Sequence, residues 1–310
     1  MNWNLFLTEL VSGVTHGSVY ALIALGYSMV YGILKLLNFA HGDVYMVGAF
    51  IGYGILTLFG GASSLSISIP LLLALMFTAS MLGGGLLGVA IERFAYRRLR
   101  NAPRIAPLIT ALGVSFFLEN AGLLLLGGDP KSYNSYGWHD LALWGGFFLP
   151  AGVKVGWAQV IVVGGAVVLV VALTLFVART QLGRAMRATS VDREAAAMMG
   201  IDVDRVIVAT FLIGSALAAA AGVFNCLVYQ NLDPYMGFQA GLKAFIAAVI
   251  GGIGNLPGAV LGGLVIGLAE AFSIGYISST FSDAVVFAIL IAVMLLRPSG
   301  LLGRAAVQKV

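Results

Sequence analysis

The sequence predicts an all-α polytopic membrane helix bundle of about 8–9 transmembrane helices, with one or two broken or short spans. Of the 310 residues, 60% are hydrophobic and only 10% are charged, and the mean hydropathy is +1.00. An average soluble domain has about a quarter charged residues, so this chain has too few charges to cover a soluble surface. The 41 glycines agree with a membrane bundle, because small residues let membrane helices approach closely.

The apolar runs define the expected spans, since a crossing needs about 20 apolar residues. We expect crossings near 5–34, 40–60, 69–92, 105–127, 155–178, 205–230, 236–254, 257–277 and 279–296. The runs at 40–60 and 236–254 are short, glycine-rich and interrupted by polar residues, so full crossing by these two stays open. No segment between spans is long enough for a soluble domain, so we expect one transmembrane domain over 1–310.

The basic residues indicate the orientation. Most of the 17 Lys and Arg residues lie at the ends of apolar runs that share one side of the membrane, whereas Lys131 and Lys154 lie opposite. The positive-inside rule places that basic side in the cytoplasm. We therefore expect the N-terminus outside, and the C-terminus and the charged loop at about 180–205 inside. The basic residues form no continuous binding face, so no nucleic-acid partner is expected.

That charged loop contains a short segment with its own helix start and stop signals. Thr189 and Ser190 are predicted to N-cap a helix that ends at Gly200, and Asp202 is placed to cap the next helix. Acidic residues in its first turn would complement the helix dipole, namely Asp192 and Glu194. A turn between two spans does not require a capped helix, so we expect a docking element for a partner outside the membrane.

The two doubtful runs begin with similar glycine- and aromatic-rich stretches, 37–45 and 233–241, which suggests an internal repeat. Broken helices in corresponding positions of two halves often mark a transport pathway. Asn38, His41 and Asp43 are either ordinary polar residues at the membrane boundary or part of unwound backbone inside the membrane.

Ionisable residues also interrupt other apolar runs, and inside a bilayer such groups are functional candidates by default. Glu119 either contacts a substrate or bonds to a neighbouring helix, and Glu270 poses the same question. Lys243 either lines a pathway or extends toward the interface. Asp283 is expected to cap the last span.

Catalytic and metal-binding patterns are missing from the sequence. The glycine-rich run 251–263 lacks the Gly-Lys-Ser/Thr of a nucleotide-binding loop, and the spacing of its glycines predicts tight helix packing around an Asn-Leu-Pro-Gly turn. Cys226 is the only cysteine and is expected to be a core residue. We expect no enzyme activity, no cofactor and no metal.

Four stretches spread over nearly the whole chain resemble the permease subunits of ABC importers for branched-chain amino acids, specifically the LivH type. The stretches are Gly32-Ile-Leu-Lys-Leu-Leu-Asn-Phe-Ala-His-Gly-Asp-Val-Tyr-Met, Gly183-Arg-Ala-Met-Arg-Ala-Thr through Gly200-Ile, Ala247-Ala-Val-Ile-Gly-Gly-Ile-Gly-Asn-Leu-Pro-Gly-Ala and Arg297-Pro-Ser-Gly-Leu-Leu-Gly-Arg. The combination is specific, although the glycine-rich stretch alone is not. The resemblance implies a permease domain over 1–310 that works by alternating access.

The resemblance also implies site residues. The segment at about 190–200 would be the coupling helix that seats in a groove of an ATPase subunit, through Ser190, Asp192, Glu194, Ala195, Ala196, Met199 and Gly200. Of these, Ala195, Ala196 and Met199 would present a small apolar face. Apart from the resemblance, the polar and aromatic residues in the apolar runs give the expected translocation pathway, which comprises Asn38, Phe39, His41, Asp43, Glu119 and Lys243.

The implied partners are a second homologous permease subunit, two ATP-binding subunits that hydrolyse ATP, and a periplasmic or lipid-anchored substrate-binding protein. The implied location is a bacterial inner membrane, with the chain in contact with lipid. Related permeases for urea or short amides are the first alternative. A proton-coupled secondary carrier is the second, because Glu119, Glu270 and His41 lie in or near the membrane.

Overall fold

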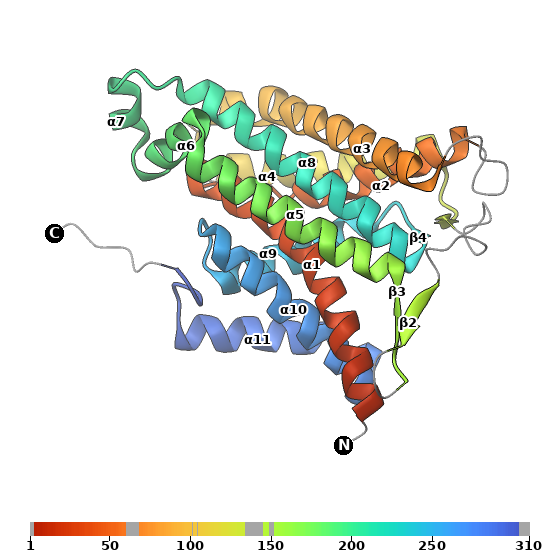
Figure 1. The fold of residues 1–310 in the computed structure, drawn as a ribbon. Helices are drawn as coiled ribbons and strands as arrows, with labels where there is room; N and C mark the ends of the chain where they lie inside the picture. The colour runs from red at the N-terminus through yellow and green to blue at the C-terminus, as the bar shows by residue number, and fades with distance from the viewer. Residues whose placement is uncertain are drawn as a thin grey trace.

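The computed structural model describes residues 3–59, 68–100, 102–103, 105–133, 145–148 and 152–303. It is built of helices that pack side by side (Figure 1). The helices are α1 (Trp3–Leu34), α2 (His41–Leu58), α3 (Ile69–Ile91), α4 (Ile105–Leu126), α5 (Trp157–Arg179), α6 (Gln181–Val191), α7 (Arg193–Met198), α8 (Val203–Tyr229), α9 (Met236–Gly251), α10 (Leu256–Tyr276) and α11 (Ser282–Leu296). Helix α3 continues into the π-helical turn η2 (Glu92–Tyr96) and the 3-10 turn η3 (Arg97–Leu99), and η7 (Ser279–Phe281) precedes α11.

Seven helical segments in the described part of the chain are long and apolar enough to cross a membrane. They contain α1, α3, α4, α5, α8, α10 and α11. Each of the nine predicted runs holds a helix, so the all-α polytopic bundle is confirmed. The two doubtful runs correspond to the short helices α2 and α9, of 18 and 16 residues, and full crossing by these two stays a prediction.

Helix α1 lies at the centre of the bundle, and its Leu22 and Ile23 are fully buried. It packs along α10 through glycines, because a Cβ atom added at Gly267 would lie only 2.2 Å from the backbone nitrogen of Gly17. The predicted glycine packing around the Asn-Leu-Pro-Gly turn is also present, since Gly262 lies against the Ala247 carbonyl of α9. These helices therefore pack with their backbones in direct contact, without large side chains between them.

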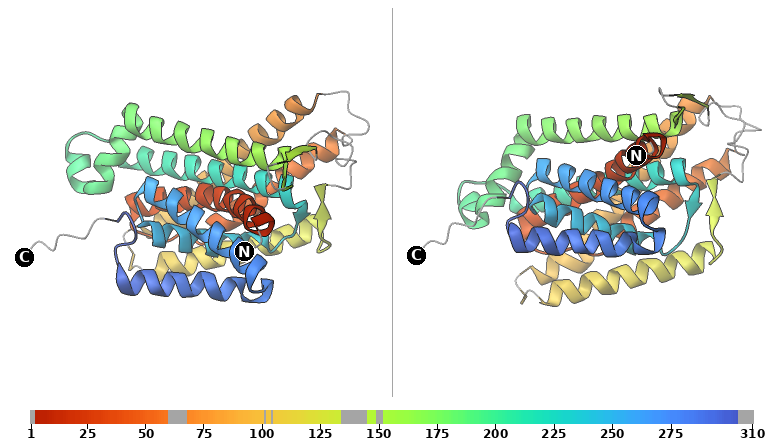
Figure 2. Two further views of the ribbon diagram at one scale, coloured as in Figure 1. Left: turned by 60° about the horizontal axis from the view of Figure 1, so that its bottom comes forward. Right: turned by 90° about the horizontal axis from the view of Figure 1, so that it is seen from below.

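The outer helices turn large apolar side chains outward. Figure 2 shows α5 along one side of the bundle and α4 along the opposite side. Exposed residues include Phe117 and Leu124 on α4, Val168 on α5 and Leu295 on α11. Surfaces of this kind fit a lipid environment, because a helix that is apolar on all sides is either buried in protein or spans a membrane.

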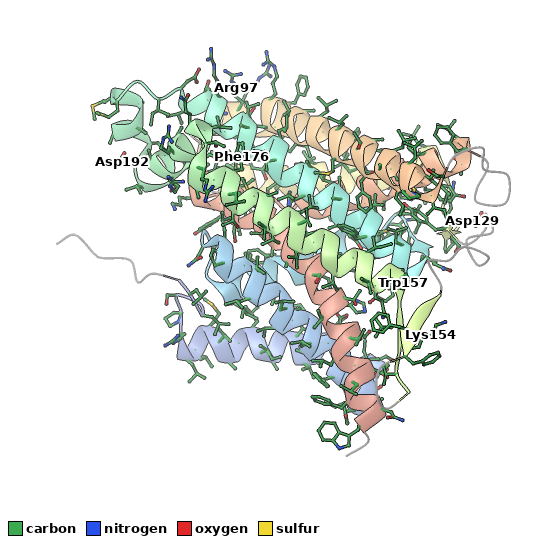
Figure 3. The ribbon with its side chains drawn as sticks, viewed as in Figure 1. Arg97, Asp129, Lys154, Trp157, Phe176 and Asp192 are labelled. Atoms are coloured by element: carbon green, nitrogen blue, oxygen red, sulfur yellow. The ribbon has the colours of Figure 1, made fainter. Side chains whose placement is uncertain are left out.

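The bundle has two distinct ends. In Figure 3, Arg97 and Asp192 lie at one end, which we call the α7 end, and Asp129, Lys154 and Trp157 lie at the opposite end. The opposite end, called the strand end, holds two short antiparallel pairs, β1 (Lys131–Ser132) with β4 (Asn231–Leu232) and β2 (Gly146–Phe148) with β3 (Lys154–Gly156). The predicted position of the C-terminus falls on 304–310, which lie outside the described residues.

Candidate functional site

The charged loop between α5 and α8 folds into α6 and α7, and α7 projects from one end of the bundle (Figure 1). Thr180 starts α6 by accepting a hydrogen bond from the Gly183 amide at 3.0 Å. Helix α6 is amphipathic, and its buried face holds Gly183, Met186 and Thr189. This face anchors α6 on the bundle and thereby positions α7.

Helix α7 begins two or three residues later than the sequence suggests. Asp192, in extended backbone, is the N-cap and accepts from the amides of Glu194 at 2.9 Å and Ala195 at 3.1 Å. The predicted caps are wrong, because Thr189 and Ser190 belong to α6 and donate to the carbonyls of Ala185 and Arg187. Both hydroxyls are satisfied inside the preceding helix, so the side chain at the next break in the helix takes the capping role.

The end of α7 follows the prediction. Gly200 has φ +82°, the left-handed conformation that terminates helices, and Asp202 caps α8 by accepting from the Arg205 amide at 3.1 Å. These signals are local in sequence and are therefore visible without the fold.

The outward surface of α6 and α7 is apolar at its centre. Val191 is 87% exposed, and Met198 and Met199 are each 82% exposed. Glu194 and Ala195 are also exposed, whereas Ala196 is 5% exposed and packs inward. The expectation that Ala196 shares the presented apolar face is therefore wrong, since a helix this short needs an inward residue to hold it against the bundle.

Arg193 connects α7 to the centre of the bundle. Its Nε atom donates to the Ile33 carbonyl oxygen at 2.7 Å, although the two residues are 160 positions apart. Ile33 lies in the last turn of α1, where carbonyl groups lack partners within the helix and the dipole favours a cation. Burial and the nearby charge of Arg100 lower the pKa of the Arg193 guanidinium.

Helix α1 ends directly after this contact. Lys35 has φ +56°, and 35–40 are not helical before α2 begins at His41. Asn38 is 2% exposed, and the Tyr96 hydroxyl donates to its side-chain oxygen and to the Leu37 carbonyl, at 3.1 Å each. The segment is therefore unwound, with Asn38 and Ala40 buried in it, and its depth in a membrane stays a prediction.

The first turns of the two short helices meet. A Cβ atom added at Gly42 of α2 would lie 2.8 Å from the Gly241 Cα atom of α9, and one added at Gly237 would lie 2.7 Å from an Asp43 carboxylate oxygen. The two stretches that the sequence marks as a possible repeat thus place the positive ends of both helix dipoles next to the Asp43 carboxylate. Only residues without a side chain allow this approach.

Asp43 faces α4 from this point. It is fully buried, and neither of its carboxylate oxygens has a hydrogen-bond partner among the described residues. Ser115 and Glu119 of α4 are close enough to act on it electrostatically. Both lie on the single buried stripe of α4, with Ser115 1% and Glu119 6% exposed.

His41 and Phe39 lie in an aromatic group beside this carboxylate. The His41 ring meets Tyr27 edge to face at 4.9 Å, and Phe39 lies 5.9 Å from Phe245 of α9, measured between ring centroids. Neither His41 nitrogen has a hydrogen-bond partner in the described part of the chain. Phe39, His41 and Asp43 thus lie near the start of α2 beside α9 and α4, with Glu119 close to Asp43, whereas Asn38 bonds to Tyr96; a shared pathway through them stays a prediction.

Lys243 belongs to a second group. Its Nζ atom lies 2.6 Å from Glu270 Oε1 and 2.8 Å from Asp283 Oδ1, and the Tyr20 hydroxyl donates to Glu270 Oε2 at 2.7 Å. Asp283 does not cap α11 with its side chain, so that prediction is wrong. Lys243, Glu270 and Asp283 lie on three different helices, so the sequence gives no signal for this group.

Sequence reasoning also missed Arg193 and Tyr96. Each makes its contact across the fold rather than along the chain, and neither stands out in composition. Within the described ranges, no three His, Cys, Asp or Glu side chains gather as metal ligands.

A polytopic bundle that has a buried polar group where two short helices meet, and an exposed apolar segment at one end, has the features of a membrane transport subunit of the permease class. The chain belongs to the family described as "Branched-chain amino acid transport system / permease component", which it matches over residues 9–294.

Curated relatives agree with the family. The chain is 44% identical over 309 residues to the high-affinity branched-chain amino acid transport system permease protein BraD of Pseudomonas aeruginosa, covering 98% of each chain. It is 43% identical over 314 residues to the corresponding protein LivH of Escherichia coli, again covering 98% of each. A probable permease LivH of Methanocaldococcus jannaschii is 26% identical over 95% of this chain and 91% of its own length. No solved structure matches the chain.

Proposed function

We propose that this chain is the permease subunit of an ATP-driven importer that moves leucine, isoleucine and valine across a bacterial inner membrane by alternating access. The observation that carries the proposal is the 43–44% identity, over nearly the full length, to permease proteins of high-affinity branched-chain amino acid transport systems. Permeases for urea or short amides, and a proton-coupled carrier, have no comparable support.

The proposed assembly contains the chain as one permease domain over 1–310, a second homologous permease, two ATP-binding subunits and a substrate-binding protein. ATP is hydrolysed in the partner subunits. The excess of basic residues supports a cytoplasmic α7 end and a strand end that faces outside. In this orientation α6 and α7 meet the ATP-binding subunit.

The proposed coupling surface consists of the exposed apolar residues around Met199 and the acidic first turn of α7, with Glu194. It includes Asp192 as the cap, Ala195 on the surface, Ala196 and Ser190 as supports, and Gly200 as the terminator. A shift of α7 would act on α1 through Arg193, directly before the break that leads to Asn38.

The proposed translocation pathway passes the ends of α2 and α9. Phe39 and His41 offer an aromatic surface for an aliphatic side chain, and Asp43 and Glu119 offer carboxylates for an ammonium group. Unwound backbone inside a membrane protein is tolerated where it is enclosed by protein or lines a cavity, which supports this location. Lys243 contributes by holding α9 in place.

The test is radiolabelled leucine uptake in cells that lack the chain, with and without the chain restored. Unlabelled valine, isoleucine, urea and acetamide serve as competitors. We expect rescue that depends on ATP and is competed by the aliphatic amino acids. Competition by urea or acetamide alone would show that the importer carries urea or short amides instead of aliphatic amino acids. Uptake driven by a pH gradient without ATP would reject the proposal.

Replacing Glu194 by Lys tests the coupling surface. The exposed carboxylate lies in the first turn of α7, so a reversed charge is expected to abolish uptake without changing membrane insertion. The matched control is Glu9→Lys, which reverses a carboxylate on α1 away from this end. Normal uptake by the Glu194 variant would contradict the assignment.

A further inference from the structure

A cleft of about 470 Å³ opens at the α7 end of the bundle. Its walls are the last turns of α1, the inner face of α6, the end of α5 and the turn that joins α9 to α10. Small-molecule sites have volumes of about 300–1,000 Å³, so the cleft is large enough for an amino-acid-sized ligand. None of the residues at the meeting ends of α2 and α9 lines it, so it is separate from the proposed pathway.

The charge of this cleft is positive. Lys35 and Arg187 line it, and its lining contains no carboxylate. Neither side chain forms an ion pair with an acidic residue in the part of the chain that the structure describes. Both residues are exposed, and Arg187 also donates to the Val177 carbonyl oxygen. Partial burial and the charge of Arg193 lower the pKa of Lys35, and a bound anion would offset this repulsion.

The inner wall adds an unused polar group. Ser28 of α1 is 1% exposed, and its hydroxyl has no hydrogen-bond partner among the described residues. Buried hydroxyl groups without partners are rare and call for an explanation. The N-terminus of the 21-residue helix α10 also reaches the cleft at Leu256, and its dipole favours an anion there.

The rest of the lining is largely apolar. Met29 and Ile33 come from α1, Met186 from α6 and Ile253 from the turn before α10. An apolar lining with a few placed polar groups is typical of a site for a small organic molecule. The combination fits a ligand that carries one negative group on a branched aliphatic body.

We propose that this cleft binds small aliphatic carboxylates, with the carboxylate between Lys35 and Arg187 and the aliphatic part against Met29 and Met186. The cleft offers no acidic group for an ammonium ion, so the carboxylate and the hydrocarbon are recognised and the amino group is not. A desamino analogue therefore binds at least as tightly as the amino acid itself.

A ligand in this cleft joins two elements that must move apart if α6 and α7 shift. Lys35 directly follows α1, whereas Arg187 lies on α6, about one turn before that helix ends. Binding holds α6 against α1 and so slows transport from the α7 end. This consequence rests on the proposed function, but the binding itself does not.

Binding is measured by calorimetry on the full chain in phosphatidylcholine nanodiscs. The ligands are leucine, isocaproate, which keeps the carboxylate and lacks the amine, and isoamylamine, which keeps the amine and lacks the carboxylate. We expect isocaproate to bind at least as tightly as leucine and isoamylamine not to bind. Equal binding of isocaproate and isoamylamine, or binding of neither, overturns the proposal.

Variants locate the site. Arg187→Gln and Lys35→Gln each remove one charge-assisted hydrogen bond and are expected to weaken isocaproate binding by about tenfold or more. Arg184→Gln is the matched control, because Arg184 is exposed on the same helix, does not line the cleft, and its side chain donates to the Arg179 carbonyl. Unfolding temperatures of all three variants check that they are folded. An equal loss in the control, or no loss in the two test variants, contradicts the location.

A repeat in phosphatidylglycerol nanodiscs separates the free carboxylate from a lipid headgroup. Unchanged isocaproate binding supports the proposal, whereas complete displacement by the anionic lipid assigns the cleft to the headgroup and rejects it. In vesicles that transport leucine, internal isocaproate is expected to slow uptake in the original chain but not in Arg187→Gln. If internal isocaproate slows uptake in neither the original chain nor Arg187→Gln, binding in the cleft does not slow transport, and the transport function itself is not affected by this result.

Discussion

Lys243 and Glu270 form an ion pair inside the bundle, with 2.6 Å between Nζ and Oε1, and this pair ties α9 to α10. The Lys243 side chain is 19% exposed and that of Glu270 8% exposed, so water screens the pair weakly. The more exposed Asp283 adds a second contact from α11 at 2.8 Å.

We expect Lys243→Met to destabilise the chain strongly, because removing one partner of a buried ion pair costs about 3–5 kcal/mol. The double variant Lys243→Met with Glu270→Gln is expected to recover most of this loss, since the only charge it leaves without its lysine partner is the exposed Asp283 carboxylate. The measurement is the unfolding temperature in detergent. Asp283→Asn is the control and should have a small effect, because 65% of its side chain is exposed. A single variant no less stable than this control would show that the pair is unimportant.

Arg193→Ala removes the hydrogen bond from α7 to the Ile33 carbonyl. A hydrogen bond to a charged group is worth about 1.5–3 kcal/mol, so we expect uptake to fall at least several-fold while the partner subunits still hydrolyse ATP. The readout is the number of ATP molecules hydrolysed per leucine imported. The control, Arg205→Ala, removes an 86% exposed arginine that pairs only with Asp202 and should leave this ratio unchanged. An unchanged ratio in the Arg193 variant would show that the contact does not transmit movement.

Asp192→Ala removes the side chain that caps α7. Loss of an N-cap costs about 1 kcal/mol, which matters in a helix of only six residues. We expect hydrogen exchange at the Glu194 and Ala195 amides to accelerate by about fivefold, from the same principle. Asp192→Asn should retain protection, and Ser190→Ala should do so as well, because Ser190 bonds within α6. Faster exchange in the Ser190 variant would show that Ser190 caps α7, as the sequence suggested.

Gly267→Ala tests the packing of α1 on α10. The added Cβ would lie 2.2 Å from the Gly17 nitrogen, which neither backbone can accommodate without moving. We expect a lower unfolding temperature and less protein in the membrane. Gly113→Ala adds the same atom where nothing lies within 4 Å, and alanine favours helix, so this control should be as stable as the original. Equal stability of the two variants would indicate loose packing between α1 and α10.

Asp43→Asn tests the proposed pathway. The carboxylate is fully buried next to Glu119 and the first turn of α9, and amide replacement removes its charge with little change of shape. We expect leucine uptake to fall by at least about tenfold, the effect of one lost charged contact, with normal membrane levels. Asp129→Asn, at the exposed strand end, is the control. Normal uptake by the Asp43 variant would exclude this carboxylate from the pathway.

Several parts of the fold could be predicted because their signals are local. The apolar runs mark nine of the eleven α-helices in the described residues, and Gly200 and Asp202 mark the end of α7 and the start of α8. The same logic failed at Ser190. Its hydroxyl can cap a helix or bond within one, and only the length of α6 decides between the two.

The sequence alone determined that the chain is a polytopic membrane protein, where most of its helices lie and that a charged, capped segment separates α5 from α8, because hydropathy and capping act within a few residues. The tertiary structure decided that Asn38 is buried in a non-helical segment, that Asp43 is buried in the first turn of α2, that Ala196 faces inward and that Lys243 pairs with Glu270. It also decided that Arg193 reaches α1 and that Lys35 and Arg187 share a cleft. Each of these relationships joins residues from different helices, and the free energy of such contacts depends on how the helices pack rather than on the order of residues along the chain.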